Sequence, residues 1–221
     1  MKLISSIIAI VIITALCAHA SAKDNSIPKE RIDAIEAAYS GCNDLTADFT
    51  QTTQIALLER TVKKDGVFQF KRGGMMRIEY KNKNAKHYVS DGSTLWTYIP
   101  GDEGSLETFA VNDKTIPKEA LSFLNGFGKL TKEFEVSNST AFDKIPKEGA
   151  ALHLIPRKKE PLYKSLDALF GADNFLTELI VYNVSGNVSR YVFSNITKNS
   201  GLSDDHFTLS SGKATPDTLP E

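Results

Sequence analysis

Residues 87–98 of the chain, HYVSDGSTLWTY, decide the fold. Two β-rich runs, 87–89 and 94–98, stand on either side of Ser90-Asp91-Gly92-Ser93. An Asp-Gly pair between such runs is a strong hairpin signal, because the tight turn needs a positive φ that glycine adopts without strain. The stretch therefore predicts two antiparallel strands joined by a short turn.

The same period-two alternation continues in both directions along the chain, which is typical of strands with two unlike faces. Before the hairpin, Phe68 and Phe70 share a face of an expected strand over 66–72, and Met76, Ile78 and Tyr80 share a face of another near 75–81. Further strands are expected at 45–50, 106–111, 134–136, 152–155, 166–170, 176–184, 188–196 and 206–209. The segment from Leu162 to Leu169 also fits a helical spacing, so a helix stays open there.

Two helices interrupt the strands. The first is expected at about 27–40, where Ser26 can cap it, Pro28 suits the first turn and Gly41 can end it. The second is expected at 117–127, which is unusually apolar for its length. Roughly ten consecutive antiparallel strands with two short helices predict one mainly β domain, built as a curved sheet or an open barrel.

The first residues predict export. Lys2 precedes an apolar run over 3–16 that is too short to cross a bilayer, which takes about 20 apolar residues. Small residues around Ala20 and Ala22 form cleavage patterns, so we expect a Sec signal peptide at 1–22, a single domain at 23–221 and a periplasmic location. An uncleaved anchor is the alternative. Leu16 directly before Cys17 disfavours lipidation, so the mature chain is expected to be soluble.

The charge balance disfavours one class of partner. The chain has 26 basic and 27 acidic residues, whereas nucleic-acid-binding proteins carry a strong basic surplus. After cleavage Cys42 is the one remaining cysteine, so no intramolecular disulfide is expected. Cys42 is expected to be a small buried residue rather than a reactive thiol.

No constellation of catalytic residues stands in the sequence. It has no Gly-x-Ser-x-Gly elbow, phosphate loop or zinc motif. His87, His153 and His206 fall on different expected strands, with no cysteine or carboxylate at the spacing of metal ligands. We therefore expect no enzyme, no metal and no cofactor, with a secreted lipid hydrolase as a weaker alternative.

The apolar supply is the feature that suggests a function. Large apolar side chains lie on successive expected strands, and the segment 117–127 is available to cover one side of them. One interpretation is an ordinary core under a covering helix; the other is a hydrophobic cavity with a helical lid. The candidate cavity residues are Phe49, Phe68, Phe70, Met76, Ile78, Tyr80, Trp96, Tyr98, Leu121, Phe123 and Leu124.

At these residues the chain resembles the LolA family of periplasmic lipoprotein carriers. The most specific match is 89–100, VSDGSTLWTYIP, and 66–72, GVFQFKR, is similar to the family's Gly-x-φ-x-φ-x-Arg strand. The other similar stretches are 49–51, 76–80, Pro117 with 121–126, 186–188 with Tyr191 and Phe193, and Phe207. Two departures are Gly73-Gly74, where the family usually has a proline, and a shortened ending at 207–210.

The resemblance implies an incomplete antiparallel barrel around a hydrophobic cavity, with helices as its lid. It implies that the protein binds lipoprotein acyl chains and carries them from the inner to the outer membrane, without cofactor or catalysis. The implied partners are an inner-membrane ATP-driven lipoprotein-releasing complex and an outer-membrane lipoprotein receptor, and a monomer is expected. A lipid sensor or scaffold of the same fold is the alternative.

Arg72 has an implied role of its own. It continues the parity of Phe68 and Phe70, so it is expected to point toward the apolar side. By the resemblance, it corresponds to the arginine that holds the lid shut in that family.

Overall fold

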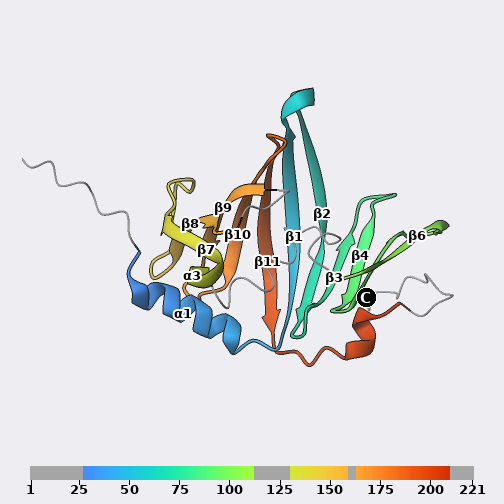
Figure 1. Cartoon of the computed structure of the whole chain (residues 1–221), viewed down its shortest axis with the longest axis horizontal. Coiled ribbons are helices and arrows are strands. Elements are labelled where there is room, and N and C mark those ends of the chain that lie inside the picture. Colours follow the sequence, from blue (N-terminus) through green and yellow to red (C-terminus); the bar gives the residue numbers. More distant parts are fainter. Residues whose placement is uncertain (1–26, 112–129, 159–162, 210–221) are drawn as a thin grey trace, which may run out of the picture.

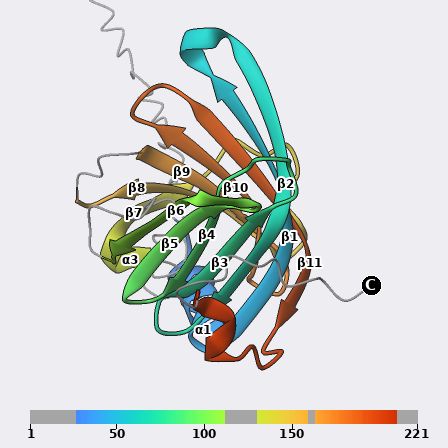
Figure 2. The same ribbon diagram turned by 90° about the vertical axis from the view of Figure 1, so that its right-hand side faces the viewer.

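One antiparallel sheet organises the protein. The computed structural model describes residues 27–111, 130–158 and 163–209. In these ranges eleven strands form the sheet, in the order β6-β5-β4-β3-β2-β1-β11-β10-β9-β8-β7. The sheet curls around its middle strands, with β6 and β7 as its two rims (Figures 1 and 2). These rims do not pair with each other, so the described sheet is an incomplete barrel, as the sequence predicted.

The strands agree closely with the expected ones. They are β1 (Asp44–Ile55), β2 (Arg60–Lys71), β3 (Met75–Tyr80), β4 (His87–Asp91), β5 (Thr94–Ile99), β6 (Asp102–Ala110), β7 (Phe134–Asn138), β8 (Ala150–Pro156), β9 (Tyr163–Phe170), β10 (Leu176–Asn183) and β11 (Val188–Lys198). The open choice at 162–169 resolves as strand over Tyr163–Phe170, where β9 pairs with both β8 and β10.

Within the described residues, four short helices accompany the sheet: α1 (Lys29–Ser40), η1 (Ala56–Leu58), α3 (Leu130–Glu133) and η3 (Asp204–Phe207). The expected helix at 27–40 is confirmed as α1, although it begins at Lys29 with Pro28 as its cap residue. Its end at Gly41 is also as predicted. Ser26, the signal peptide at 1–22 and the expected helix at 117–127 lie outside the described residues.

The prediction of a strand at 206–209 was wrong. Residues Asp204–Phe207 form the 3-10 helix η3, which lies against β3 and β4 on the far side of the sheet from α1 (Figures 1 and 2). Phe207 is fully buried there. Both neighbouring strands already have partners on each side, so the segment covers a face of the sheet instead of extending it.

A buried carboxylate holds the start of this C-terminal segment. Asp44 accepts hydrogen bonds from the Ser200 hydroxyl at 2.8 Å, the Ser200 N–H at 2.7 Å and the Gly201 N–H at 3.0 Å. Lys71 adds a bond from its Nζ to the carbonyl of Leu202 at 2.6 Å. The beginning of β1 and the end of β2 thus direct the chain from β11 toward η3.

The hairpin that decided the fold packs against its neighbour in space. The Asp91 carboxylate accepts from the N–H groups of Ser93 at 2.8 Å and Thr94 at 2.6 Å, and Gly92 has φ +91°. A side chain on Gly92 would collide with the carbonyl of Gly73 in the β2–β3 turn. Gly92 therefore lets the two turns at this end of the sheet lie in contact.

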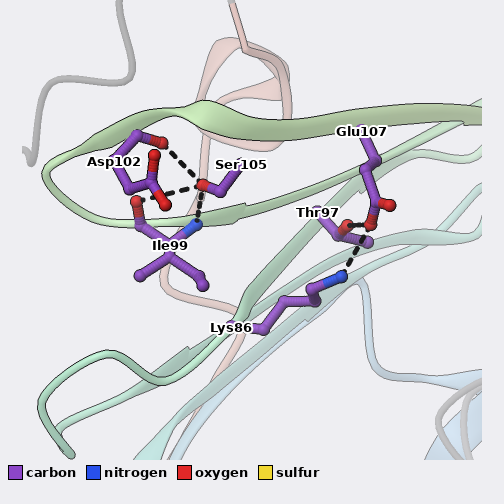
Figure 3. A network of polar contacts seen from close by, with 6 residues as sticks. All are labelled: Lys86, Thr97, Ile99, Asp102, Ser105 and Glu107. Atoms are coloured by element: carbon purple, nitrogen blue, oxygen red, sulfur yellow. Dashed lines mark hydrogen bonds and ion pairs between the residues drawn. The ribbon is translucent and has the colours of Figure 1, made fainter.

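Polar side chains tie the rim strand β6 to the sheet (Figure 3). Glu107 accepts from Lys86 at 2.6 Å and from Thr97 at 3.1 Å, and the hydrogen bond from Lys86 is the main cause that lowers the pKa of Glu107. At the β5–β6 turn, the Ile99 N–H donates to the Ser105 hydroxyl at 2.7 Å, and this hydroxyl donates to the Asp102 carbonyl at 2.6 Å. The rim therefore has side-chain support in addition to its single ladder.

Candidate functional site

The face of the sheet that carries α1, here called the inner face, is apolar. Strand register places Phe70 opposite Met76, and Phe68 opposite Ile78. It also places Phe49 opposite both Gly66 and Phe193. Directly opposed residues of antiparallel strands project on the same side. Phe49, Phe68, Phe70, Met76, Ile78 and Tyr80 are therefore brought together as predicted.

The aromatic rings on this face contact one another across strands. The Phe49 and Tyr80 rings meet edge to face with centroids 5.3 Å apart, and the Phe68 and Phe193 centroids are 6.4 Å apart. Tyr191 lies 6.3 Å from Phe49. Tyr191 and Phe193 were not among the predicted cavity residues, although they alternate in the expected strand 188–196. Their membership follows from the pairing of β11 with β1, which joins the two ends of the chain.

Burial on the inner face is incomplete at its centre. Phe49, Phe68 and Met76 are buried, whereas Phe70, Ile78, Tyr80, Tyr191 and Phe193 are only partly buried. Where α1 crosses the sheet, by contrast, Ile35 and the β8 residues Leu152 and Leu154 are fully buried. The inner face thus combines a closed apolar core beneath α1 with an aromatic surface that is partly accessible.

Polar groups replace apolar ones on the inner face toward the β1–β2 turn. The Tyr80 hydroxyl donates to Gln51 at 2.8 Å, and the Thr53 and Ser189 hydroxyls lie 3.0 Å apart. Lys64 lies over the Tyr80 ring, with its Nζ 5.1 Å from the centroid. The aromatic surface is therefore bounded by polar side chains at this end.

The placement of Trp96 and Tyr98 among the cavity residues was wrong. Trp96 is opposite Val89, which is opposite Arg77, and all three project from the outer face. Tyr98 likewise pairs with His87, and their rings lie 5.4 Å apart. Both residues alternate correctly, but a single-residue change of register reverses the face, and periodicity alone does not set the register between strands. Leu121, Phe123 and Leu124 lie outside the described residues.

Arg72 directly follows the end of β2, and the residue is exposed. Its Nε donates to the carbonyl of Cys42 at 3.0 Å, and its N–H donates to the carbonyl of Asn43 at 2.9 Å. Cys42 follows the end of α1 by two residues. The arginine therefore joins the strand to the backbone just past α1. Its acceptor is a backbone carbonyl near a helix end, a place where carbonyls often lack a partner within the helix.

A polar hollow of about 510 Å³ lies on the outer face, across β7 to β10. Its lining includes His153, whose Nδ1 is 2.9 Å from an Asp167 oxygen, and Tyr182. Burial is the main cause that raises the pKa of Tyr182 to about 12, and the Asp167 carboxylate adds to the effect. This pair was not predicted, because His153 and Asp167 come together only through the register between β8 and β9. No large aliphatic side chain lines the hollow, so it does not suit acyl chains.

Within 27–111, 130–158 and 163–209, no three His, Cys, Asp or Glu side chains are grouped so as to hold a metal ion. Over the same ranges, no helix is both long and apolar enough to cross a bilayer.

The described residues thus form an unclosed antiparallel barrel, with an aromatic inner face and a helix across that face. The sequence profile of the family described as "Outer membrane lipoprotein carrier protein LolA" matches residues 40–210. The chain belongs to the LolA family.

Relatives agree with this assignment at low identity. The outer-membrane lipoprotein carrier protein of Pasteurella multocida is 25% identical over 176 residues, covering 80% of each chain. That of Chromobacterium violaceum is 24% identical over 179 residues, covering 81% of this chain and 82% of its own. A crystal structure of a LolA superfamily protein from Nitrosomonas europaea superposes with a TM-score of 0.47 at 11% identity, covering 82% of this chain and 97% of that one.

Proposed function

We propose that this protein is a periplasmic carrier that binds the acyl chains of lipoproteins and takes them from the inner to the outer membrane. The observation that carries the proposal is the aromatic inner face, which is only partly buried although it lies inside a curled sheet. Membership of the LolA family and the names of the relatives support the same role.

The energetics suit a carrier rather than an enzyme. Burial of a CH₂ group contributes about 0.8 kcal/mol, so one long acyl chain gains on the order of 10 kcal/mol in a dry apolar site. Binding of this strength needs no catalytic group, and we propose that the protein performs no reaction on its cargo. The main physical requirement is release, because cargo held this tightly leaves slowly unless another process opposes the binding.

The need to load and release tightly bound cargo leads us to propose two partners. An inner-membrane, ATP-driven lipoprotein-releasing complex would load the carrier, and an outer-membrane lipoprotein receptor would accept the cargo. The signal peptide at 1–22 would deliver the protein to the periplasm, where the mature chain would begin at Ser21 or Lys23 and act as a monomer.

A pair of matched variants tests the site. Ile78 is partly buried on the inner face, whereas Val192 is 44% exposed on the outer face. Ile78→Asn should weaken binding of a fluorescent acyl ligand about tenfold, because it places an amide against the chain. Val192→Asn should leave the affinity unchanged. Equal affinities in the two folded variants would remove the inner face from the binding site.

The transport role has its own test. Native mass spectrometry of protein purified from its own periplasm should detect bound lipoprotein. Depletion of the protein should leave lipoproteins in the inner membrane. Normal localisation after depletion would instead support the lipid sensor or scaffold.

A further inference from the structure

The most exposed apolar side chains of the described residues gather at one projecting point. Leu57 is 91% exposed and Leu58 is 62% exposed, and both lie in η1 at the turn between β1 and β2. Figure 1 shows this turn extending beyond the rest of the sheet, at the end away from α1. Val184, in the neighbouring β10–β11 turn, is 48% exposed. We call Leu57 and Leu58 the hairpin tip.

Backbone pairing and a side-chain hydrogen bond hold the hairpin tip in place. The β1–β2 pairing runs unbroken to Ile55 opposite Arg60, directly below the leucines. The Ala56 N–H donates to the Asn187 side chain at 3.0 Å, which ties the tip to the β10–β11 turn. Glu59 closes η1 in the left-handed conformation, with φ 47°. The backbone therefore holds two leucines outward, although folding them inward would remove apolar surface from water.

Basic side chains stand below the leucines. Arg60 is the first residue of β2, and Lys63 follows three positions later; both are exposed. Lys64 is next to Lys63 on the opposite face, over Tyr80. Glu59 is the one acidic residue in the segment 55–64. An apolar point above a positive collar is the arrangement that peripheral proteins present to the interface of an anionic bilayer.

From this geometry we infer that the hairpin tip inserts Leu57 and Leu58 into the interface of an anionic lipid bilayer. A protein partner fits the surface less well, because a stable protein interface takes about 800 Å² from each side and usually has a packed, complementary centre. The hairpin tip offers two adjacent side chains at a convex point. Insertion would place the polar end of the inner face, with Gln51 and Thr53, next to the lipid headgroups.

This inference is separate from the proposed carrier function, because it concerns the protein's own contact with lipid and needs no cargo. The mature chain is mixed with vesicles of phosphatidylglycerol and phosphatidylcholine, or of phosphatidylcholine alone, and sedimented. We expect binding to the anionic vesicles that weakens as salt is added. Absence of binding to anionic vesicles at low salt would overturn the inference.

Paired variants isolate the leucines. Leu57→Ser with Leu58→Ser should lower the vesicle partition coefficient about 100-fold, at about tenfold for each leucine. The matched control is Ile145→Ser with Ile155→Ser, two exposed isoleucines in and beside β8, four places from β1 in the sheet order. It should bind as the unaltered protein does. Equal binding by the two double variants would also overturn the inference.

A second pair isolates the charges, and a label reports depth. Arg60→Gln with Lys63→Gln should weaken binding about tenfold and reduce its salt dependence, whereas Lys144→Gln with Lys147→Gln should change little. In a Leu58→Cys variant, a polarity-sensitive dye should shift to the blue on vesicles, since the native Cys42 is buried and stays unlabelled. A dye that stays water-exposed on vesicles, or shifts only with a membrane protein present, would contradict insertion.

Discussion

The packing around Gly66 explains why a glycine stands at the first position of the Gly-x-φ-x-φ-x-Arg strand in this chain. The ring of Phe49 lies across this glycine, so that a Cβ there would be 2.6 Å from the ring carbon Cζ and would also meet the carbonyl of Glu79. The backbone of Gly66 is ordinary, and its role is to leave room. The glycine therefore allows Phe49 to reach Tyr80 across β2.

Gly66→Ala should lower the free energy of unfolding by about 1–3 kcal/mol, the usual cost of overpacking a core. Urea denaturation measures it. The matched control is Gly104→Ala in β6, where the nearest heavy atom to the added Cβ is 3.5 Å away. An equal change in both variants would mean that the close approach of Phe49 is not what the glycine provides.

Asp44 links stability to pH. Burial alone would raise the pKa of Asp44, but the hydrogen bonds from Ser200 and Gly201 outweigh it and lower the pKa below the ordinary value of about 3.9. A carboxyl with a lowered folded pKa stabilises the protein above its unfolded pKa, and this contribution disappears as the pH falls toward the folded value. The free energy of unfolding should therefore decrease as the pH is lowered past about 4.

Asp44→Asn should flatten this acid dependence, because an amide does not titrate. Urea midpoints measured from neutral pH to about pH 3 report it. The exposed Asp143 supplies the control, and Asp143→Asn should keep the acid loss of the unaltered protein. If Asp44→Asn retained the full loss, other carboxyls would have to account for it.

Arg72 is expected to affect the release of cargo. We propose that its bond to the Cys42 carbonyl favours the cargo-free arrangement and so assists release. Charged hydrogen bonds contribute roughly 1.5–3 kcal/mol, but exposure reduces this, so about 1–2 kcal/mol is expected. Arg72→Leu should then slow release of a fluorescent acyl ligand about fivefold to 30-fold.

Arg157 provides the comparison for that measurement. It is also exposed, and its Nε donates to the carbonyl of Thr131 at the same 3.0 Å distance, between α3 and the end of β8. Arg157→Leu should leave the release rate unchanged. Equal rates for Arg72→Leu and the unaltered protein, with the fold intact by circular dichroism, would remove Arg72 from the release step.

Strands with one apolar face were predictable, and those without one were not. Alternation in 66–72 and 75–81 locates β2 and β3, because their large apolar side chains lie on one face. In 176–184 the apolar residues run together, and Leu179, Ile180 and Val181 of β10 are all buried. The outer parts of the β1–β2 hairpin were missed, since 50–54 is TQTTQ and has no apolar face to report. The hairpin tip was missed with them, because its significance lies in exposure, which a sequence does not display.

The inner face could be predicted from the sequence only as far as β3. There the β2–β3 turn places Phe68 and Phe70 beside Ile78 and Met76. Trp96 and Tyr98 required the register of β4 and β5, and Tyr191 required a pairing between the two ends of the chain. Side-chain period within a strand is local, whereas the match between strands depends on turns and bulges that the period does not specify.

The short helix η3 packs against the outer face of β3 and β4, and its Phe207 is the side chain buried there. Phe207 is fully buried, so Phe207→Ala should lower the free energy of unfolding by about 3–5 kcal/mol. Phe109→Ala on the rim strand, where the ring is only partly buried, should cost clearly less. Chemical denaturation measures both. A loss at Phe207 no larger than that at Phe109 would show that η3 is dispensable for the sheet.

The apolar interior formed by the described residues is divided among three clusters. One cluster lies beneath α1, the second joins β1, β2 and β11, and the third, around Met76 and Leu95, lies toward the β6 rim. The two rims are not joined in the described sheet. Because each half has its own cluster, a change in the distance between the rims does not require the apolar core beneath α1 to open.

The pairing of β1 with β11 has a consequence for how the protein is made. Leu45 pairs with Lys198, so the central strand of the sheet waits for nearly the last strand to leave the ribosome. At about 5 to 20 residues per second, the delay is on the order of ten seconds. Until then the strands β1 to β6 can pair with one another, but the second edge of β1 has no partner. An unpaired strand edge is a template for pairing with another chain, so the half-made sheet is most exposed to aggregation until β11 arrives.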